Sequence, residues 1–160
     1  MKFNRVCFYV LFFLLLGNLP LQSQTSRSDY YFINEAVTLS PDWKLTQDFG
    51  FFYDANFPWI YHNSLGFNYL AQGGPNNDFY MWSKEMNSWI WSQKFYFPFA
   101  YHFNYQTWVW FHLDGTNSWY YHYNAAQWYK VGAGPVIEPD PEPEPPRLPS
   151  TLPEVSRFLS

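Results

Sequence analysis

The sequence predicts an all-β fold, an antiparallel meander of short aromatic hairpins with repeat-like spacing. Nine tryptophans, eleven tyrosines and eleven phenylalanines lie between Trp43 and Val131. Most of them occur as an aromatic residue, any residue and a second aromatic residue, as in Trp89-Ile90-Trp91. A period of two places both rings on one face of a strand. These triplets begin every eight to twelve residues, the spacing of a strand followed by a short turn.

Residues 1–24 are predicted to be a signal peptide. Lys2 and Arg5 give a positive start, Val6 to Leu16 is an unbroken apolar run, and Leu21-Gln22-Ser23 offers a small-residue cleavage site. An uncleaved anchor is the rival interpretation, but eleven apolar residues fall short of the ~20 that a spanning helix needs. We therefore expect a secreted or cell-envelope protein with no transmembrane span after cleavage.

Cleavage of this leader would remove Cys7, the one cysteine of the chain. The mature protein could then form no disulfide, and its stability would come from burial. The chain has 9 basic and 13 acidic residues and a formal net charge of −4, with no basic stripe. Nucleic-acid binding therefore lacks its usual electrostatic footprint.

Three zones are expected after the leader: a lead-in segment at 25–42, the aromatic body at 43–131 and an acidic, proline-rich tail at 132–160. The lead-in is polar apart from Tyr30-Tyr31-Phe32-Ile33. The tail holds eight of the thirteen prolines, several alternating with acids, so we expect a disordered, extended spacer.

Turn-forming residues separate the triplets within the body. Asp and Asn favour turns because their side chains bond nearby backbone, and Asp-Gly is a strong hairpin signal. The longest break, Gln72 to Asp78, is expected to be a loop between a first half (43–71) and a second half (79–131). Pro98 cannot donate to a ladder, so it predicts an edge strand, a bulge or a corner. The expected short turns are Asp54 to Asn56, Asn63-Ser64, Lys84 to Asn87, Asp114 to Asn117 and Asn124 to Ala126.

The body also contains internal similarity. Phe49 to Tyr53 and Leu65 to Tyr69 both read apolar-Gly-Phe-x-Tyr, sixteen residues apart, which suggests a stacked hairpin array. A helical fold is disfavoured by the aromatic content and the missing apolar stripe. A membrane barrel is disfavoured because its strands need about 9–11 residues.

The body resembles an aromatic module found near the end of many secreted or surface-associated bacterial proteins. Its motifs are an apolar-Gly-aromatic-aromatic-Tyr string, Pro-Trp-Ile-Tyr-His, Leu-Gly-aromatic-x-Tyr, Trp-x-Trp and Trp-aromatic-Tyr. The resemblance implies extracytoplasmic location and fold type but no activity. Trp119-Tyr120-Tyr121 is also similar to choline-binding cell-wall repeats, without their glycine spacing. In this chain the module's motifs lie at Phe49 to Tyr53, Pro58 to His62, Leu65 to Tyr69, Trp89 to Trp91 and Trp119 to Tyr121, with Phe51 and Phe67 where tryptophan is commoner.

Rows of aromatic side chains suit sugar binding, because the apolar face of a sugar ring stacks on Trp or Tyr. A trimethylammonium group could instead sit over such rings by cation–π attraction. The competing interpretation is that the rings form the core of a body that is poor in Leu and Val, paired across strands. The candidate stacking residues are Trp59, Tyr61, Trp89, Trp91, Trp108, Trp110, Trp119 and Tyr121.

Metal binding and catalysis have weaker signals. The histidines, His62, His102, His112 and His122, could meet at one repeat position or could simply mark strand ends. A glycoside hydrolase needs two facing acids about 5–9 Å apart. The body carboxylates fall mostly in predicted turns, so we expect neither an enzyme nor a cofactor. They are Asp48, Asp54, Asp78, Glu85 and Asp114.

The sequence thus favours a secreted or envelope, non-catalytic module that binds a polysaccharide or another envelope component. The alternative is a structural or assembly module of a surface protein, with no small ligand.

Overall fold

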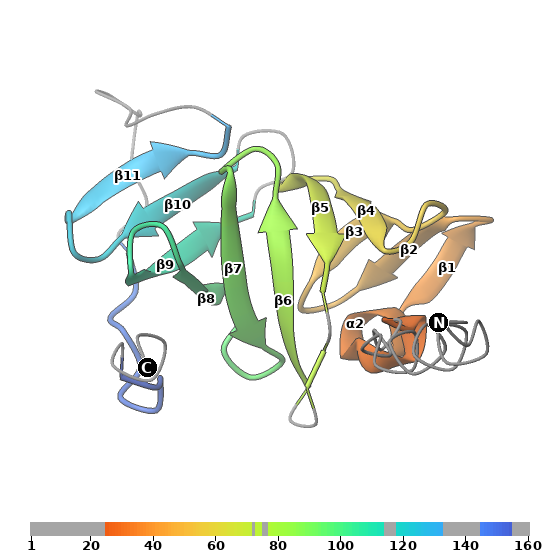
Figure 1. The fold of residues 1–160 in the computed structure, drawn as a ribbon, viewed down its shortest axis with the longest axis horizontal. Coiled ribbons are helices and arrows are strands. Elements are labelled where there is room, and N and C mark those ends of the chain that lie inside the picture. The colour runs from red at the N-terminus through yellow and green to blue at the C-terminus, as the bar shows by residue number, and fades with distance from the viewer. Residues whose placement is uncertain (1–24, 72, 75–76, 114–117, 133–144, 155–160) are drawn as a thin grey trace, which may run out of the picture.

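The computed structural model describes residues 25–71, 73–74, 77–113, 118–132 and 145–154 (Figure 1). The predicted leader and the remaining parts of the tail lie outside these ranges. Two short helices come first, η1 (Arg27–Asp29) and α2 (Tyr31–Asn34). The strands that follow are β1 (Val37–Ser40), β2 (Trp43–Thr46), β3 (Gly50–Tyr53), β4 (Trp59–His62), β5 (Gly66–Leu70), β6 (Asp78–Ser83), β7 (Ser88–Gln93), β8 (Phe99–His102), β9 (Thr107–His112), β10 (Trp119–His122) and β11 (Gln127–Lys130).

The strands of the described residues form one antiparallel sheet in chain order, so the predicted all-β meander is confirmed. The sheet continues across the loop predicted at 72–78, because β5 pairs with β6 through Asn68↔Ser83 and Leu70↔Met81. Pro98 lies in the turn between β7 and β8, outside both strands. Among the described residues, no helix has the length and apolar character that would take it across a bilayer.

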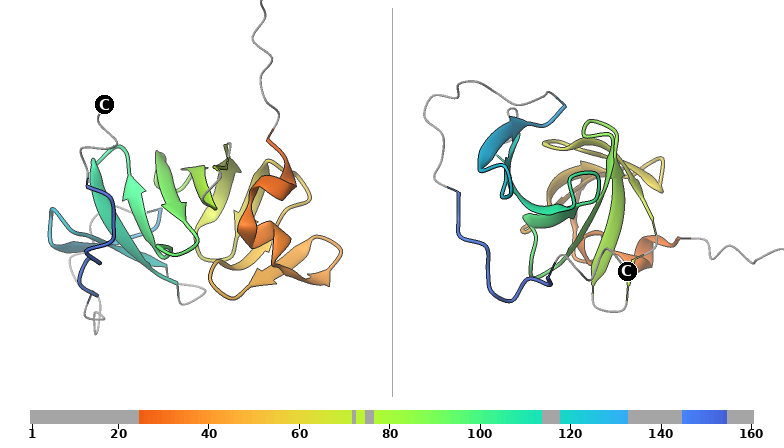
Figure 2. Two further views of the ribbon diagram at one scale, coloured as in Figure 1. Left: turned by 90° about the horizontal axis from the view of Figure 1, so that it is seen from below. Right: turned by 60° about the vertical axis from the view of Figure 1, so that its left-hand side comes forward.

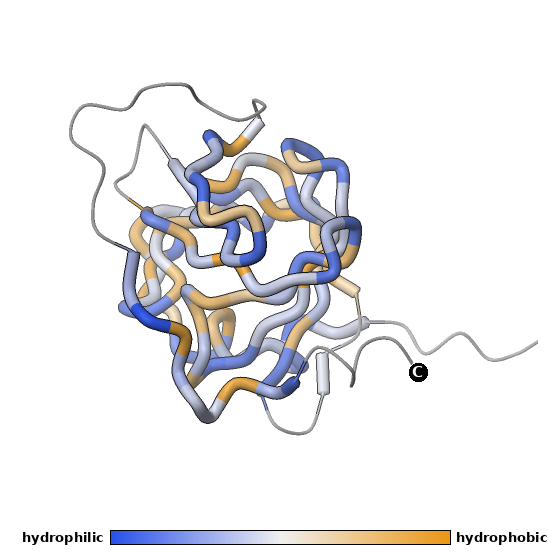
Figure 3. Tube along the Cα trace, turned by 90° about the vertical axis from the view of Figure 1, so that its left-hand side faces the viewer, coloured by the Kyte–Doolittle hydropathy of each residue, from blue (hydrophilic) through white to orange (hydrophobic). Residues whose placement is uncertain are grey.

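The sheet curls, and its inner face encloses the main core (Figures 2 and 3). In the first half, the middle residue of each triplet points inward: Phe52, Ile60 and Asn68 are buried. The flanking rings therefore share the outer face. The period-two pattern gives this outer row, while the residues between the rings make the core.

The predicted lead-in is an integral part of that core. Tyr30 to Ile33 are buried, in and next to α2, and the Phe32 ring stacks on Phe49 with centroids 3.9 Å apart. Helix α2 thus lies against the inner face near β1 to β3 (Figure 2). Since it has four residues, it leaves no periodic signal in the sequence.

Buried side chains cap the turns at one end of the sheet. The Nδ1 atom of His62 accepts the backbone N–H groups of Ser64 and Leu65 at 3.0 and 3.1 Å, and its Nε2–H donates to the Phe49 carbonyl at 2.5 Å. The same bond, from a backbone N–H three residues on, recurs at His102 (3.3 Å), His122 (3.1 Å) and, with a hydroxyl, Ser83 (3.2 Å). These two histidines and His62 end strands β8, β10 and β4, as the strand-end interpretation expects.

A left-handed residue follows each capped turn. It stands four positions after the capping residue, at Gly66, Asn87, Gln106 and Ala126, and Gly50 holds the same place after Thr46. Glycine adopts this conformation without the crowding that a Cβ brings. A left-handed residue at this place therefore recurs at alternate hairpins, in connections of three residues after Thr46 and His62 and of four residues after Ser83, His102 and His122.

Burial makes the capping histidines pH-sensitive. It lowers the pKa of His62 to about 4 and, with the nearby charge of His122, that of His102 to about 4. The unfolded chain, with an ordinary His pKa near 6.5, binds more protons between about pH 6.5 and 4. Each of the two should therefore remove about 3 kcal/mol of unfolding free energy as the pH falls through this window.

Urea unfolding at a series of pH values measures this loss. The variant His62→Asn should have a flatter pH profile than the parent. The variant His112→Asn is the control, because His112 lies half-buried on the outer face and caps no turn that the structure describes. A parent profile that is flat between pH 7 and 4 would contradict the assignment of neutral caps.

Relief of the left-handed strain should stabilise the fold. Ala126 is exposed with φ of 51°, so Ala126→Gly should raise the unfolding free energy by about 0.5–1 kcal/mol. Thermal unfolding checks it against Ala125→Gly, where the neighbouring alanine has no positive φ and glycine should destabilise.

Candidate functional site on the outer face

Cross-strand pairing arranges the outer rings in rows. Each row joins directly opposed residues on four successive strands, so the rings touch as cross-strand pairs. Successive rows begin two strands further along the sheet. The rows are Trp43–Tyr53–Tyr61–Phe67, Trp59–Tyr69–Trp82–Trp89, Tyr80–Trp91–Tyr101–Trp108 and Phe99–Trp110–Tyr121–Trp128.

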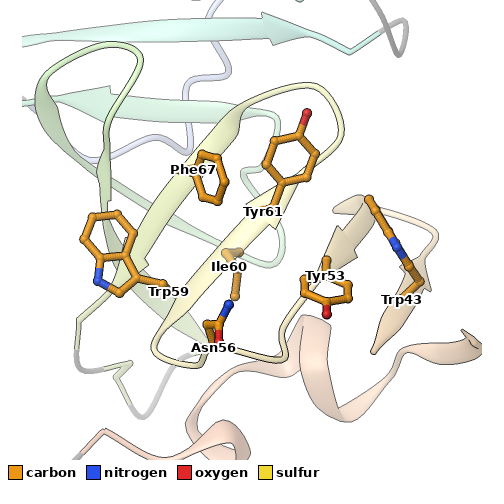
Figure 4. Close-up of a pocket in the computed structure, with 7 residues that line it drawn as sticks. All are labelled: Trp43, Tyr53, Asn56, Trp59, Ile60, Tyr61 and Phe67. Carbon is orange, nitrogen blue, oxygen red and sulfur yellow. The ribbon is translucent and has the colours of Figure 1, made fainter. Parts of the chain in front are cut away.

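A pocket of about 330 Å³ opens at the first of these rows, and we call it the outer pocket (Figure 4). Its rings meet at steep angles: the centroids of Trp43 and Tyr61 are 6.2 Å apart at 86°, and those of Tyr61 and Phe67 are 5.0 Å apart at 66°. Steep packing leaves ring faces open, and Trp59 and Phe67 are 41% and 47% exposed. The lining residues are Trp43, Tyr53, Asn56, Trp59, Ile60, Tyr61 and Phe67.

No charged side chain of the described residues lines the outer pocket, although Lys84 Nζ lies 5.4 Å from the centroid of the Phe67 ring. The nearby carboxylate of Asp54 is buried and engaged, since its Oδ2 accepts from Lys44 Nζ at 2.5 Å and from Arg27 Nε at 3.3 Å. The pocket therefore offers apolar ring faces, the amide of Asn56, tyrosine hydroxyls and indole N–H groups. Such a lining suits a neutral ligand with apolar faces and hydrogen-bonding groups.

The structure brings together two of the eight predicted stacking residues, Trp59 and Tyr61, in this pocket. Trp89 is 37% exposed beside Trp82, whereas Trp91 and Trp108 are buried. The remaining three lie half-buried on the outer face nearer β11: Trp110, Trp119 and Tyr121.

Sequence reasoning missed Trp43, Tyr53 and Phe67 as partners of Tyr61. The signal that could have found them is register, because counting outward from each turn sets these residues directly opposite one another.

A second cluster of rings on the outer face is covered by residues 145–154, the C-terminal segment. Leu152 packs against the cluster formed by Trp91, Tyr101 and Trp108. Three rings donate to carbonyls of the segment: Tyr96 Oη to Thr151 and Trp108 Nε1 to Pro153, at 3.0 and 3.1 Å, and Tyr123 Oη to Pro146. We expected a free spacer, but in these ten residues the tail lies on the body. The reason is that its carbonyls and one leucine find partners among the rings of the body.

The described carboxylates of the body have other partners or lie in turns. The described residues contain no group of three His, Cys, Asp or Glu side chains that could hold a metal ion. The carboxylate of Asp54 is engaged by cations, and Asp78 accepts from Trp91 Nε1 at 3.1 Å. Asp48 and Glu85 lie in turns, and Asp114 lies outside the described residues.

Comparison with known proteins assigns no family: no family model, curated protein or solved structure matches this chain.

Burial divides the outer rings into those that hold the fold and those free to meet a ligand. Trp91→Ala should cost about 3–5 kcal/mol of unfolding free energy, because the ring is 1% exposed. Trp59→Ala should cost less than about 2 kcal/mol, because the ring is already 41% exposed. Denaturant unfolding of both variants measures the difference, and equal losses would mean that the outer pocket is structural.

Proposed function

We propose that this protein is a non-catalytic recognition module, acting outside the cytoplasm, that binds a polysaccharide or another envelope component through the outer pocket. The observation that carries the proposal is the pocket lined by the rings of Trp43, Trp59, Tyr61 and Phe67, in which Trp59 and Phe67 are 41% and 47% exposed. Contiguous exposed apolar surface of this kind marks interaction sites. A volume of about 330 Å³ falls at the lower end of the ~300–1,000 Å³ typical of ligand sites.

The neutral lining supports recognition without chemistry. A ligand would gain from ring stacking and from hydrogen bonds to Asn56, with no acid placed to cleave it. The predicted leader supports the location, since an exported chain would meet envelope components.

The alternative is a structural or assembly module. It is favoured by the amount of ring surface already used within the sheet, such as Trp82 against Trp89 at 5.7 Å. In that case the rings of the outer pocket would serve the stability of the fold.

Sedimentation with insoluble peptidoglycan, chitin and cellulose, and with a detergent-solubilised envelope fraction, tests the proposal. Trp59→Ala and Phe67→Ala should each reduce retention at least tenfold while the fold remains intact by circular dichroism. The matched control is Phe51→Ala, since Phe51 is 46% exposed on the same face but does not line the pocket. Equal retention of all three variants, or no retention of the parent on any matrix, would favour the structural alternative.

A further inference from the structure

The outer pocket has a counterpart in the same chain. Residues 57–62 read Phe-Pro-Trp-Ile-Tyr-His and residues 97–102 read Phe-Pro-Phe-Ala-Tyr-His, forty positions later. In both copies the proline carbonyl accepts a backbone N–H from the strand after next in the chain, that of Leu70 at 2.8 Å and that of Phe111 at 3.1 Å. The tyrosines also pair alike: Tyr61 lies between Tyr53 and Phe67, as Tyr101 lies between Trp91 and Trp108.

Strands β2–β5 and β6–β9 are therefore two copies of one four-strand unit. This equivalence fixes, position by position, what stands in the second copy where the first has its pocket. The second copy has Tyr80, Trp91, Tyr96 and Phe99 where the first has Trp43, Tyr53, Asn56 and Trp59. It has Ala100, Tyr101 and Trp108 where the first has Ile60, Tyr61 and Phe67.

The two copies differ in occupancy. In the second, the C-terminal segment lies on the site: Leu152 packs on the rings of Trp91, Tyr101 and Trp108, and the carbonyls of Thr151 and Pro153 accept from the rim. In the first, the pocket stays open, with Trp59 and Phe67 41% and 47% exposed, and Lys84 Nζ lies over the Phe67 ring at 5.4 Å from its centroid.

We propose that the outer pocket binds a proline-flanked peptide that inserts one branched aliphatic side chain between the rings, as the C-terminal segment does in the second copy, where Leu152 ends a turn closed by its N–H to the Pro149 carbonyl at 3.1 Å. This inference rests on the proposed function, since it names the partner of the same pocket. As in other aromatic grooves that recognise proline-rich segments, the prolines limit the entropy that the peptide loses on binding, and its carbonyls accept from ring donors.

The first copy keeps the apolar part of this site but lacks one of the two ring donors that bond the carbonyls of Thr151 and Pro153 in the second copy. Phe67 replaces Trp108 and so lacks the indole N–H that bonds Pro153, and Asn56 replaces Tyr96, which leaves an amide as the donor to a carbonyl. The first copy should therefore bind a peptide from another molecule more weakly and exchange it more readily.

Titration of a fluorescein-labelled peptide into the full chain tests the inference. The peptide has the sequence of residues 145–154, Pro-Pro-Arg-Leu-Pro-Ser-Thr-Leu-Pro-Glu, and anisotropy reports binding. Trp59→Ala and Phe67→Ala should weaken binding at least tenfold, and Phe51→Ala should leave it unchanged. A peptide with alanine in place of its second leucine should also bind at least tenfold more weakly.

A variant that binds the peptide more tightly than the parent excludes damage to the fold as the cause of the changed affinity. Phe67→Trp restores the missing indole donor and should tighten the peptide about two- to tenfold, the effect of one hydrogen bond. Phe51→Trp adds the same ring at a matched exposure outside the pocket and should change nothing.

Three results would overturn the inference. The peptide could fail to bind, or it could bind with an affinity that Phe67→Ala and Phe67→Trp leave unchanged but that Tyr123→Phe alters, which would place it at the tail-covered site. It could also fail while a polysaccharide matrix retains the parent and releases Trp59→Ala, in which case the pocket is a sugar site and the proposed function stands. If neither ligand responds to the pocket variants, the proposed function falls as well.

Discussion

The fold depends on pairing of aromatic rings across strands that are too short to hold themselves together. Each strand has four to six residues and so contributes few ladder hydrogen bonds. The rings supply the missing stabilisation on both faces: Phe32 and Phe49 stack inside, and the outer rows connect each strand to the next. Ring pairs add about 0.5–1.5 kcal/mol beyond the area they bury. A sheet of brief strands can therefore be stable without a disulfide, provided that the register keeps the rings opposed.

That register is set at one end of the sheet by the turns. At four of these turns a side chain accepts the N–H three residues on and a left-handed residue follows, which holds the turn between its two strands. Neutral imidazole performs this task at His62, His102 and His122, because a ring buried against the turn can accept at Nδ1 only when that nitrogen is unprotonated. Aromatic pairing and turn geometry thus depend on each other, since a one-residue slip would turn each outer ring inward.

The period-two pattern was sufficient to predict strands, their antiparallel order and their spacing. It could not predict which face was buried, because Trp59 and Ile60 are both large and apolar and either could point inward. It also missed α2, where four residues give no periodicity although Phe32 is fully buried. Composition alone places the C-terminal segment in the spacer, since four of its ten residues are proline. The signal for contact was a single leucine, Leu152, and carbonyl acceptors that every residue carries.

The repeated unit presents the same aromatic surface twice, and the two copies differ in what covers that surface. In one copy the chain's own C-terminal segment covers Trp91 and Trp108 and supplies acceptors for the ring donors. In the other, the described residues leave Trp59 and Phe67 open to solvent. Because the backbone register is the same in both, folding alone does not require the open copy. Either the exposed rings are left over from duplication of the unit, or a ligand covers them. The absence of the indole donor at Phe67 fits a ligand that must leave again, since fewer hydrogen bonds shorten the lifetime of a complex.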